Sequence, residues 1–461
     1  MPPTGIPSKP VPSVPARGLR LQIAIALLLA LSAAPRAQAR PSVYLELGPA
    51  YEYTNLIYRS SDLTYLGTLC DTCGEILVHD TLVVNSAPES SPGAYFKLAV
   101  GDTAAPGRYY SIEPQLRLEN LLVTGHLNGA ARWTMESGAF VGLDQRLDHS
   151  LDQRFGLSRR YDSEVFAALA GYRTDDLSWS ADLRPRVQLD RVNSDTPDYL
   201  QNANGARLEL TGSHLSETAG TADVDAYVGK KDYPDSALRD YREAYLGLRA
   251  DQGLMGDLRA SLDGEFERHG GDRQAERHDL FRRWEGEAEL DWLGLDWSGR
   301  GRLQGEAYDY FNPDSIYFTS RIWRAEVGGG RHLTRSFEVE VRPRMEWLRA
   351  PRLPGEEYRQ ISLVLGATWL SRGLVDVSFE AGRRHYIGPQ VPDSAVALPL
   401  LPHSDYHFYS LSALASRALG PHLRLNGTLD YLAEVHDVPA DNNHIVYVSA
   451  ELGYGFRVWG R

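Results

Sequence analysis

WEGEAELDWLGLDWSGRGRLQGEAY, residues 284–308, alternates between apolar or small side chains and polar ones with a single break. Up to Trp292 the even positions are apolar or small and the odd positions are acidic. After Leu293-Gly294 the odd positions are apolar or small and the even positions are polar. Successive side chains of a β-strand point to opposite sides, so this period of two predicts two strands. The short break between them predicts a hairpin.

The rest of the chain repeats this unit. Runs of similar alternation follow one another to the C-terminus, which predicts an all-β fold with about 18–20 strands. We expect strands near 43–53, 92–101, 107–118, 121–134, 137–149, 160–173, 177–192, 204–214, 220–230, 241–251, 256–268, 280–292, 295–309, 316–331, 335–349, 358–371, 374–387, 404–419, 422–436 and 443–459.

The connections between the expected strands alternate in length from residue 135 onward. Short ones, such as 174–176 and 332–334, take turns with long ones, such as 193–203 and 388–403. Short turns at one rim and long loops at the other are typical of up-and-down transmembrane barrels, with the short turns periplasmic and the long loops extracellular. Both termini then lie on the short-turn side. The connection at 119–120 should be long in this scheme, and it is short.

The N-terminal 39 residues differ from the rest of the chain. Arg17 and Arg20 precede an apolar run, 21–34, and Ala37-Gln38-Ala39 fits a small-x-small cleavage site. This layout predicts a secretory signal peptide over 1–39, followed by one barrel domain over 40–461. Elsewhere no run of about 18 apolar residues suggests a helical membrane span.

The net charge of the chain restricts the kinds of partner that it can bind. The chain has 48 basic and 61 acidic residues. Removing residues 1–39 would take away four of the basic residues and none of the acidic ones, which leaves a net charge of −17. A strong acidic excess argues against nucleic acid as a partner.

The only two cysteines, Cys70 and Cys73, fall in a stretch, 54–91, that we expect to be a long irregular loop or a plug segment with a β-rich patch at 76–84. In an exported chain such a pair predicts a local disulfide. A metal site would need about four ligands, and only His79 lies near. A redox motif would need a strand-to-helix context, which is missing. We therefore predict no metal and no cofactor.

Alternation alone does not say which face points inward, but two observations favour an apolar exterior. About twenty strands in one barrel enclose more space than side chains can fill, so the interior must be wet. The apolar face is also rich in small residues, for example Gly286, Ala288 and Gly301, which would pack a soluble core poorly.

The tryptophans of the apolar face give a third observation. One set lies near the expected short turns and another near the long-loop ends, as in the two aromatic belts of a membrane barrel. The alternative is that aromatic residues are simply common in strands. The first set is Trp133, Trp179, Trp292, Trp297 and Trp369, and the second is Trp284 and Trp347.

The last expected strand, VYVSAELGYGFRVW at 446–459, places Val446, Leu452 and Phe456 on one face. It resembles the final strand of Gram-negative outer-membrane β-barrel proteins, which the barrel-insertion machinery reads. In that class an aromatic residue usually closes the chain, whereas here Gly460 and Arg461 follow Trp459. The resemblance implies an outer-membrane location and contacts with outer-membrane lipid and lipopolysaccharide. It is porin-like and at the level of the class, so it assigns no functional residues.

The charged face is the candidate functional surface. Acidic and basic side chains project from it on several strands, and such rows can set the ion preference of a pore. The alternative is that they form cross-strand pairs that stiffen a filled lumen. The candidate pore-lining residues are Glu285, Glu287, Glu289, Arg300, Arg302, Glu338, Glu340, Arg342, Arg344, Arg184 and Arg186.

The sequence shows no signature of an enzyme. It has no HExxH, no GxSxG and no phosphate-binding loop. Carboxylates two residues apart, such as Glu287 and Glu289, are too frequent to indicate acid–base catalysis. Charged loops at 269–279 and 437–442 could bind a divalent ion or lipopolysaccharide phosphate, or could simply be solvated.

The sequence therefore predicts a porin-like outer-membrane channel for passive passage of small polar solutes or ions, exported by a cleaved signal peptide. The alternative is a barrel without transport, structural, adhesive or surface-binding, with a plugged lumen. An exported soluble β-protein is a third hypothesis. A homo-oligomer is compatible with the sequence, but no interface can be recognised in it.

Overall fold

The computed structural model describes the chain between Ser42 and Trp459 except for fourteen short gaps. The predicted signal peptide, 1–39, and the predicted disulfide, Cys70 with Cys73, lie outside the described residues. The gaps are 66–77, 86–88, 103–107, 120–121, 153–158, 195–201, 217–219, 235–238, 272–276, 278, 313–318, 372, 388–403 and 438–441.

The described chain is almost entirely β-strand, and each strand pairs antiparallel with its neighbours in one sheet. A single turn of 3-10 helix, η3 (Pro354–Glu356), interrupts it. The strands are β1 (Ser42–Tyr65), β2 (Val78–Asn85), β3 (Glu89–Asp102), β4 (Arg108–Glu119), β5 (Leu122–Thr134), β6 (Ala139–Asp152), β7 (Arg159–Arg173), β8 (Trp179–Ser194), β9 (Ala203–Leu215), β10 (Thr221–Asp232), β11 (Tyr241–Met255), β12 (Leu258–Gly270), β13 (Phe281–Leu293), β14 (Trp297–Tyr310), β15 (Ser320–Thr334), β16 (Phe337–Arg349), β17 (Tyr358–Leu370), β18 (Gly373–Tyr386), β19 (Tyr406–Ala418), β20 (Leu423–His436) and β21 (Asn443–Trp459).

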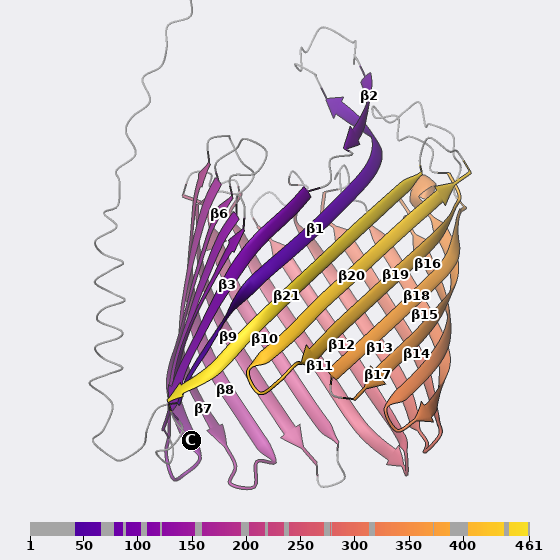
Figure 1. Cartoon of the computed structure of the whole chain (residues 1–461). Helices are drawn as coiled ribbons and strands as arrows, with labels where there is room; N and C mark the ends of the chain where they lie inside the picture. The colour runs from indigo at the N-terminus through magenta and orange to yellow at the C-terminus, as the bar shows by residue number, and fades with distance from the viewer. Residues whose placement is uncertain are drawn as a thin grey trace, which may run out of the picture.

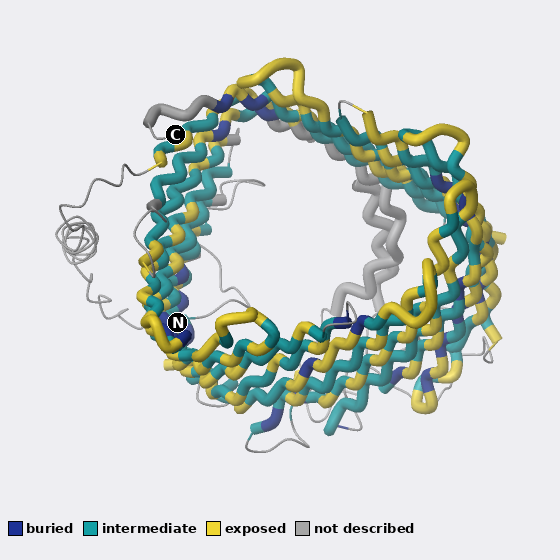
Figure 2. The backbone as a smooth tube through the Cα atoms, turned by 90° about the horizontal axis from the view of Figure 1, so that it is seen from below, coloured by how far each residue is buried: buried dark blue, intermediate teal, exposed yellow. Residues whose placement is uncertain are grey.

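The sheet closes on itself, because β1 pairs with β3 on one side and with the last strand, β21, on the other. Leu47, for example, is opposite both Phe96 and Tyr454. All strands except β2 form this ring, which is therefore a 20-strand barrel in which consecutive strands are neighbours. Figure 1 shows the tilted wall from the side, and Figure 2 shows the ring along its axis. The predicted all-β, up-and-down barrel of about 18–20 strands is confirmed.

The stretch 54–91 was expected to be an irregular loop or a plug segment with a β-rich patch at 76–84. Its described part is β-strand, and β2 falls on that patch. Residues 54–57 continue β1 in the wall, and 58–65 pair with β2 in a ribbon that rises above the rim (Figure 1). The continuation of β1 through 54–65 was not predicted, because the prediction relied on apolar–polar alternation. A ribbon beyond the wall has neither a lipid face nor a lumen face to impose that pattern.

The connections differ between the two rims as predicted. At one rim the described turns are short: β11 and β12 are separated by Gly256-Asp257, and β15 and β16 by Arg335-Ser336. At the other rim most connections are longer, for example 350–357 between β16 and β17. The connection at 120–121 is the exception, as the sequence indicated. Both ends of the wall, the start of β1 and the end of β21, lie at the short-turn rim.

Gly138 shows why a short turn can require one particular residue. It lies in the turn between β5 and β6 with φ +84°, a conformation that costs glycine little and other residues more. A Cβ atom at this position would lie 2.0 Å from the carbonyl oxygen of Arg173. The turn therefore requires glycine both for its backbone angle and for the close approach of the neighbouring strand.

The outer face of the wall is apolar and exposed. Leu303, Val327 and Leu365 are 52%, 63% and 43% exposed, in the middle of their strands. A soluble protein rarely exposes so wide an apolar surface, whereas a membrane barrel presents it to lipid. The tryptophans predicted for two belts, such as Trp292 and Trp284, lie on this face toward the short turns and toward the long loops.

Among the described residues, no helix is long and apolar enough to cross a membrane.

Candidate functional site

The polar face of each wall strand is the inner one. On β13 the even positions are exposed, whereas Glu285, Glu287 and Glu289 at odd positions are only partly exposed. The wall is curved, so side chains converge on its concave side and diverge on its convex side. All eleven candidate pore-lining residues lie on the converging, inner face, which we call the inner wall.

Ion pairs that skip a strand support this assignment. Arg344 on β16 lies 3.3 Å from Glu380 on β18, and Lys231 on β10 lies 3.2 Å from Asp190 on β8. Neighbouring strands are about 4.8 Å apart, so such a pair spans roughly 10 Å of backbone. Concave curvature shortens that span for long side chains.

The candidate residues of β13 and β14 contact one another. Arg302 lies 2.5 Å from Glu287, and Arg300 lies 3.6 Å from Glu289. Glu285 accepts a hydrogen bond of 2.6 Å from the Gln304 side chain. The sequence had placed these residues on one face. The register of the hairpin puts Arg302 opposite Glu289 and Arg300 opposite Asp291, and each arginine also reaches the acid one step along the strand.

The remaining candidates divide into two groups. On β16, Arg342 lies 3.1 Å from Glu340, and Glu338 accepts a hydrogen bond of 2.7 Å from Ser298 on β14. The other two are distant from these, on β8. Arg186 lies 3.3 Å from Glu209 of β9, and Arg184 lies 3.6 Å from Asp144 of β6. The structure therefore joins nine of the eleven on β13–β16 and places two on another part of the wall.

Glu326 of β15 is the most enclosed acid of this network, and the sequence reading did not single it out. Its side chain is 5% exposed and lies 3.2 Å from Arg342 and 2.8 Å from Arg344. Glu346 is similar, with Arg324 at 2.6 Å and a hydrogen bond of 2.6 Å from the Tyr358 hydroxyl. Alternation placed both on the inner face, but pairing depends on register, which one strand does not reveal.

Glu326→Gln is expected to lower the free energy of unfolding by about 3 kcal/mol. The substitution keeps the size of the side chain but removes the charge that balances two guanidinium groups, and unbalancing a buried pair costs about 3–5 kcal/mol. The lower end applies because Arg344 retains Glu380 and Arg342 retains Glu340. Urea unfolding of the barrel in lipid vesicles measures the difference.

Glu287→Gln is the matched control. Its partner Arg302 is 40% exposed, so the loss should stay below about 1 kcal/mol. If the two substitutions lowered the free energy of unfolding equally, the ion pairs of Glu326 would be as weak as ion pairs exposed to water.

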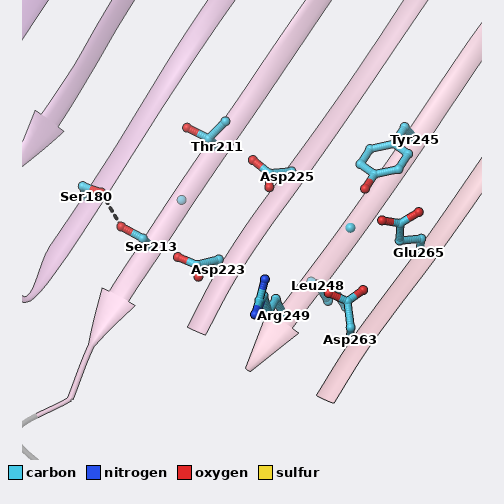
Figure 3. A pocket seen from close by; sticks show the side chains of 12 residues that line it. Ser180, Thr211, Ser213, Asp223, Asp225, Tyr245, Leu248, Arg249, Asp263 and Glu265 are labelled. Carbon is cyan, nitrogen blue, oxygen red and sulfur yellow. Dashed lines mark hydrogen bonds between the residues drawn. The ribbon is translucent and has the colours of Figure 1, made fainter. Parts of the chain in front are cut away.

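An acidic hollow of about 460 Å³ lies in the inner wall toward the short-turn rim (Figure 3). Four carboxylates line it, with Arg249 as the one basic lining residue. No described basic side chain lies within ion-pair distance of Asp223, Asp225 or Asp263. The hollow is lined by Ser180, Thr211, Gly212, Ser213, Asp223, Asp225, Tyr245, Gly247, Leu248, Arg249, Asp263 and Glu265.

Gly247 helps to form this hollow. It lies on the inner face between Asp225 of β10 and Glu265 of β12, which are its partners in register. A Cβ atom on Gly247 would lie 2.6 Å from the hydroxyl oxygen of Tyr245. Glycine therefore leaves room for the tyrosine ring beside the carboxylates.

The acidic character continues around the wall. The register places Asp225, Glu265, Glu285 and Glu306 in one row across β10–β14. Arg283 is within ion-pair distance of the last three, at 3.5 Å from Glu265 and 2.8 Å from Glu306. One guanidinium thus serves three carboxylates, so the row keeps a net negative charge.

Aromatic side chains occupy the inner wall nearer the long loops. The ring of His269 lies 4.9 Å from Tyr241 and 4.7 Å from Phe281, and Phe281 lies 5.6 Å from Tyr308. On the β17–β19 part of the wall, Arg384 lies 4.0 Å from the ring centre of Tyr358. The sequence reading missed this aromatic zone because these residues sit at strand ends, where alternation is weakest.

Within the described chain, no group of three or more His, Cys, Asp or Glu side chains is arranged to hold a metal ion.

A closed ring of 20 antiparallel strands, apolar outside and charged inside, is the fold of Gram-negative outer-membrane β-barrel proteins. No family model matches the sequence, and no curated protein matches it. Several solved structures do match the chain in fold. The copper transporter OprC is 9% identical, with a TM-score of 0.53 over 91% of this chain and 80% of its own.

Two further structures are similar. The siderophore receptor PirA from Pseudomonas aeruginosa is 10% identical, with a TM-score of 0.49 over 89% of this chain and 80% of its own. OpdL of Pseudomonas aeruginosa is 13% identical, with a TM-score of 0.43 over 91% of this chain and 99% of its own. At these identities the likeness concerns the fold.

Proposed function

We propose that the protein is a porin-like channel of the outer membrane, through which small polar solutes or ions pass passively. The observation that carries this is the inner wall. Its charged side chains line a closed ring too wide for side chains to fill, while the exterior is apolar. A polar surface inside and a lipid-compatible surface outside are what a water-filled pore requires.

The wall also supports a preference for cations. Three acids of the hollow, Asp223, Asp225 and Asp263, have no basic partner among the described residues, and they give the short-turn half of the pathway a negative potential. Rings of Asp and Glu favour cations in channels. The excess of acidic over basic residues in the whole chain has the same sign.

The plugged barrel is the competing proposal. Every described strand belongs to the wall or to the β1–β2 ribbon, so the described part of 54–91 supports a wall and a ribbon rather than a plug. A structural, adhesive or surface-binding barrel would still have the same exterior. Only a measurement of transport distinguishes the two proposals.

Export through a cleaved signal peptide over 1–39 remains a prediction, as does recognition of the last strand by the insertion machinery. Both follow from the proposed location. The short-turn rim would then face the periplasm and the long-loop rim the outside.

Ion conductance across a planar bilayer is the test of the proposed channel. The refolded full-length mature chain should conduct in discrete steps, because each inserted barrel adds one pore. A correctly folded barrel that never conducts would favour the plugged alternative.

A further inference from the structure

The outer face carries a repeated pair of residue types next to the long-loop rim. In the β12–β13 hairpin Phe266 is opposite Trp284, with their ring centres 4.3 Å apart. The next outward-facing pair toward the long loops is Arg268 opposite Arg282. Both arginines are exposed. An aromatic pair is thus followed by an arginine pair.

The β15–β16 hairpin repeats the arrangement. Trp323 is opposite Trp347, and Arg321 is opposite Arg349 one step nearer the long loops. Outward-facing arginines at the same end of β11 and β17 extend the series, and all are exposed. We call the set the arginine belt: Arg242, Arg268, Arg282, Arg321, Arg349 and Arg359.

The belt has few counter-charges. Arg282 lies 3.4 Å from Asp309, and Arg268 lies 5.7 Å from the centre of the Phe311 ring. No described acidic side chain pairs with the other four. Like charges directly opposite one another destabilise a sheet. Two Arg–Arg pairs on one surface therefore indicate that anions from outside the chain neutralise them.

Among the described residues of the opposite rim, this arrangement is absent. Exposed basic residues on its outer face, such as Arg331 and Arg417, stand opposite apolar or small residues, as Arg331 does opposite Val339. Arg331 lies over the Trp297 ring at 5.0 Å. The concentration of arginine at one rim means that the barrel presents different charges to the two membrane leaflets.

The depth of the arginines in the membrane indicates which kind of anion neutralises them. Tryptophan marks the boundary between hydrocarbon and headgroups, and the arginines lie two residues, about 7 Å, beyond Trp284, Trp323 and Trp347. That is the level of lipid headgroups. Guanidinium groups bind phosphate through paired, charge-assisted hydrogen bonds.

We propose that the arginine belt binds the phosphate groups of lipid headgroups in the leaflet on the long-loop side, which is lipopolysaccharide in a Gram-negative outer membrane. The site is on the barrel wall rather than in the charged loops 269–279 and 437–442. It does not depend on whether the lumen conducts.

His385 and Arg383 of β18 lie beside the belt but have an internal partner. Asp405 lies within ion-pair distance of both, at 3.4 Å from Arg383. Burial raises the pKa of Asp405, but hydrogen bonds from His385 and the Tyr386 amide outweigh it and hold the pKa below its usual value. Asp405 therefore stays ionised and neutralises this end of the surface.

The test is the binding of lipid A by the folded full-length chain in neutral detergent with EDTA, followed by energy transfer from tryptophan to a labelled lipid. Arg321→Gln with Arg349→Gln should weaken binding about 30-fold, because each basic residue at an anionic lipid surface contributes about fivefold. Arg331→Gln with Arg417→Gln is the matched control and should bind like the original protein.

Folding of each variant is checked by its heat-modifiable migration on a gel. A second comparison needs no variant: the original protein should bind phosphorylated lipid A at least tenfold more tightly than the same lipid after its phosphates are removed. Equal affinity for the two lipids would overturn the proposal. So would an equal loss in both double variants, or saturation of the response by inorganic phosphate alone.

Discussion

Leu303→Arg should prevent the chain from assembling in a membrane. Leu303 lies at the seventh of the fourteen positions of β14, between Ala288 and Ala325 in register, and is 52% exposed on the outer face. An arginine on the lipid face near the midplane costs about 2–4 kcal/mol. That is a large part of the 5–15 kcal/mol that stabilises a typical domain. Refolding into vesicles, followed by the heat-modifiable gel shift, measures the assembled fraction.

Gln304→Arg introduces the same residue one position along the strand and is the matched control. Gln304 points to the inner wall, where it donates to Glu285 and accepts from Arg324, so an added positive charge there meets one carboxylate and one guanidinium in a wetted, mixed-charge surface. This variant should assemble normally. If both variants assembled alike, or if only Gln304→Arg failed, the assignment of inner and outer faces would be reversed.

Asp223→Lys with Asp225→Lys should convert the preference of the channel from cations toward anions. The two carboxylates line the acidic hollow, and their replacement changes the charge of the pathway by four units. We expect the cation-to-anion permeability ratio to fall about tenfold, which corresponds to about 1.4 kcal/mol. The reversal potential of the reconstituted protein in a potassium chloride gradient measures it.

The neutral double variant, Asp223→Asn with Asp225→Asn, should shift the reversal potential about half as far. Both shifts should shrink in about 1 M salt, where the screening length falls to roughly 3 Å. An unchanged reversal potential in a conducting lysine variant would place the selective part of the pathway elsewhere.

The sequence predicted the fold well because a membrane barrel is unusually regular. Lipid outside and water inside impose the same apolar–polar alternation on every wall strand, as in Trp284–Tyr308. The alternation then shows which side chains face lipid and which face the lumen. The same rule failed at residues 58–65, which pair with β2 beyond the wall. There the backbone alone determines the strand, and the side chains carry no periodic signal.

The candidate site was predictable as a face but not as a set of contacts. Alternation placed Arg342 and Arg344 on the inner wall, yet the acid that joins them, Glu326, comes from a strand whose register the sequence does not reveal. Asp223 and Asp225 were missed for a similar reason. They join the acids of β12 around one hollow across β11, where Gly247 lies between Asp225 and Glu265 and Arg249 lies between Asp223 and Asp263. The arginine pairs of the outer face likewise become visible only once hairpin registers are known.

Single-channel conductance of the refolded mature chain, on a sample whose heat-modifiable migration proves that the barrel is folded, tests the open pore most directly. The structure predicts stepwise conductance with a preference for cations. A sample that shows the gel shift without conductance would contradict the open lumen and leave a closed barrel with a surface role. A chain that stays soluble in plain buffer without the shift would contradict the membrane barrel itself.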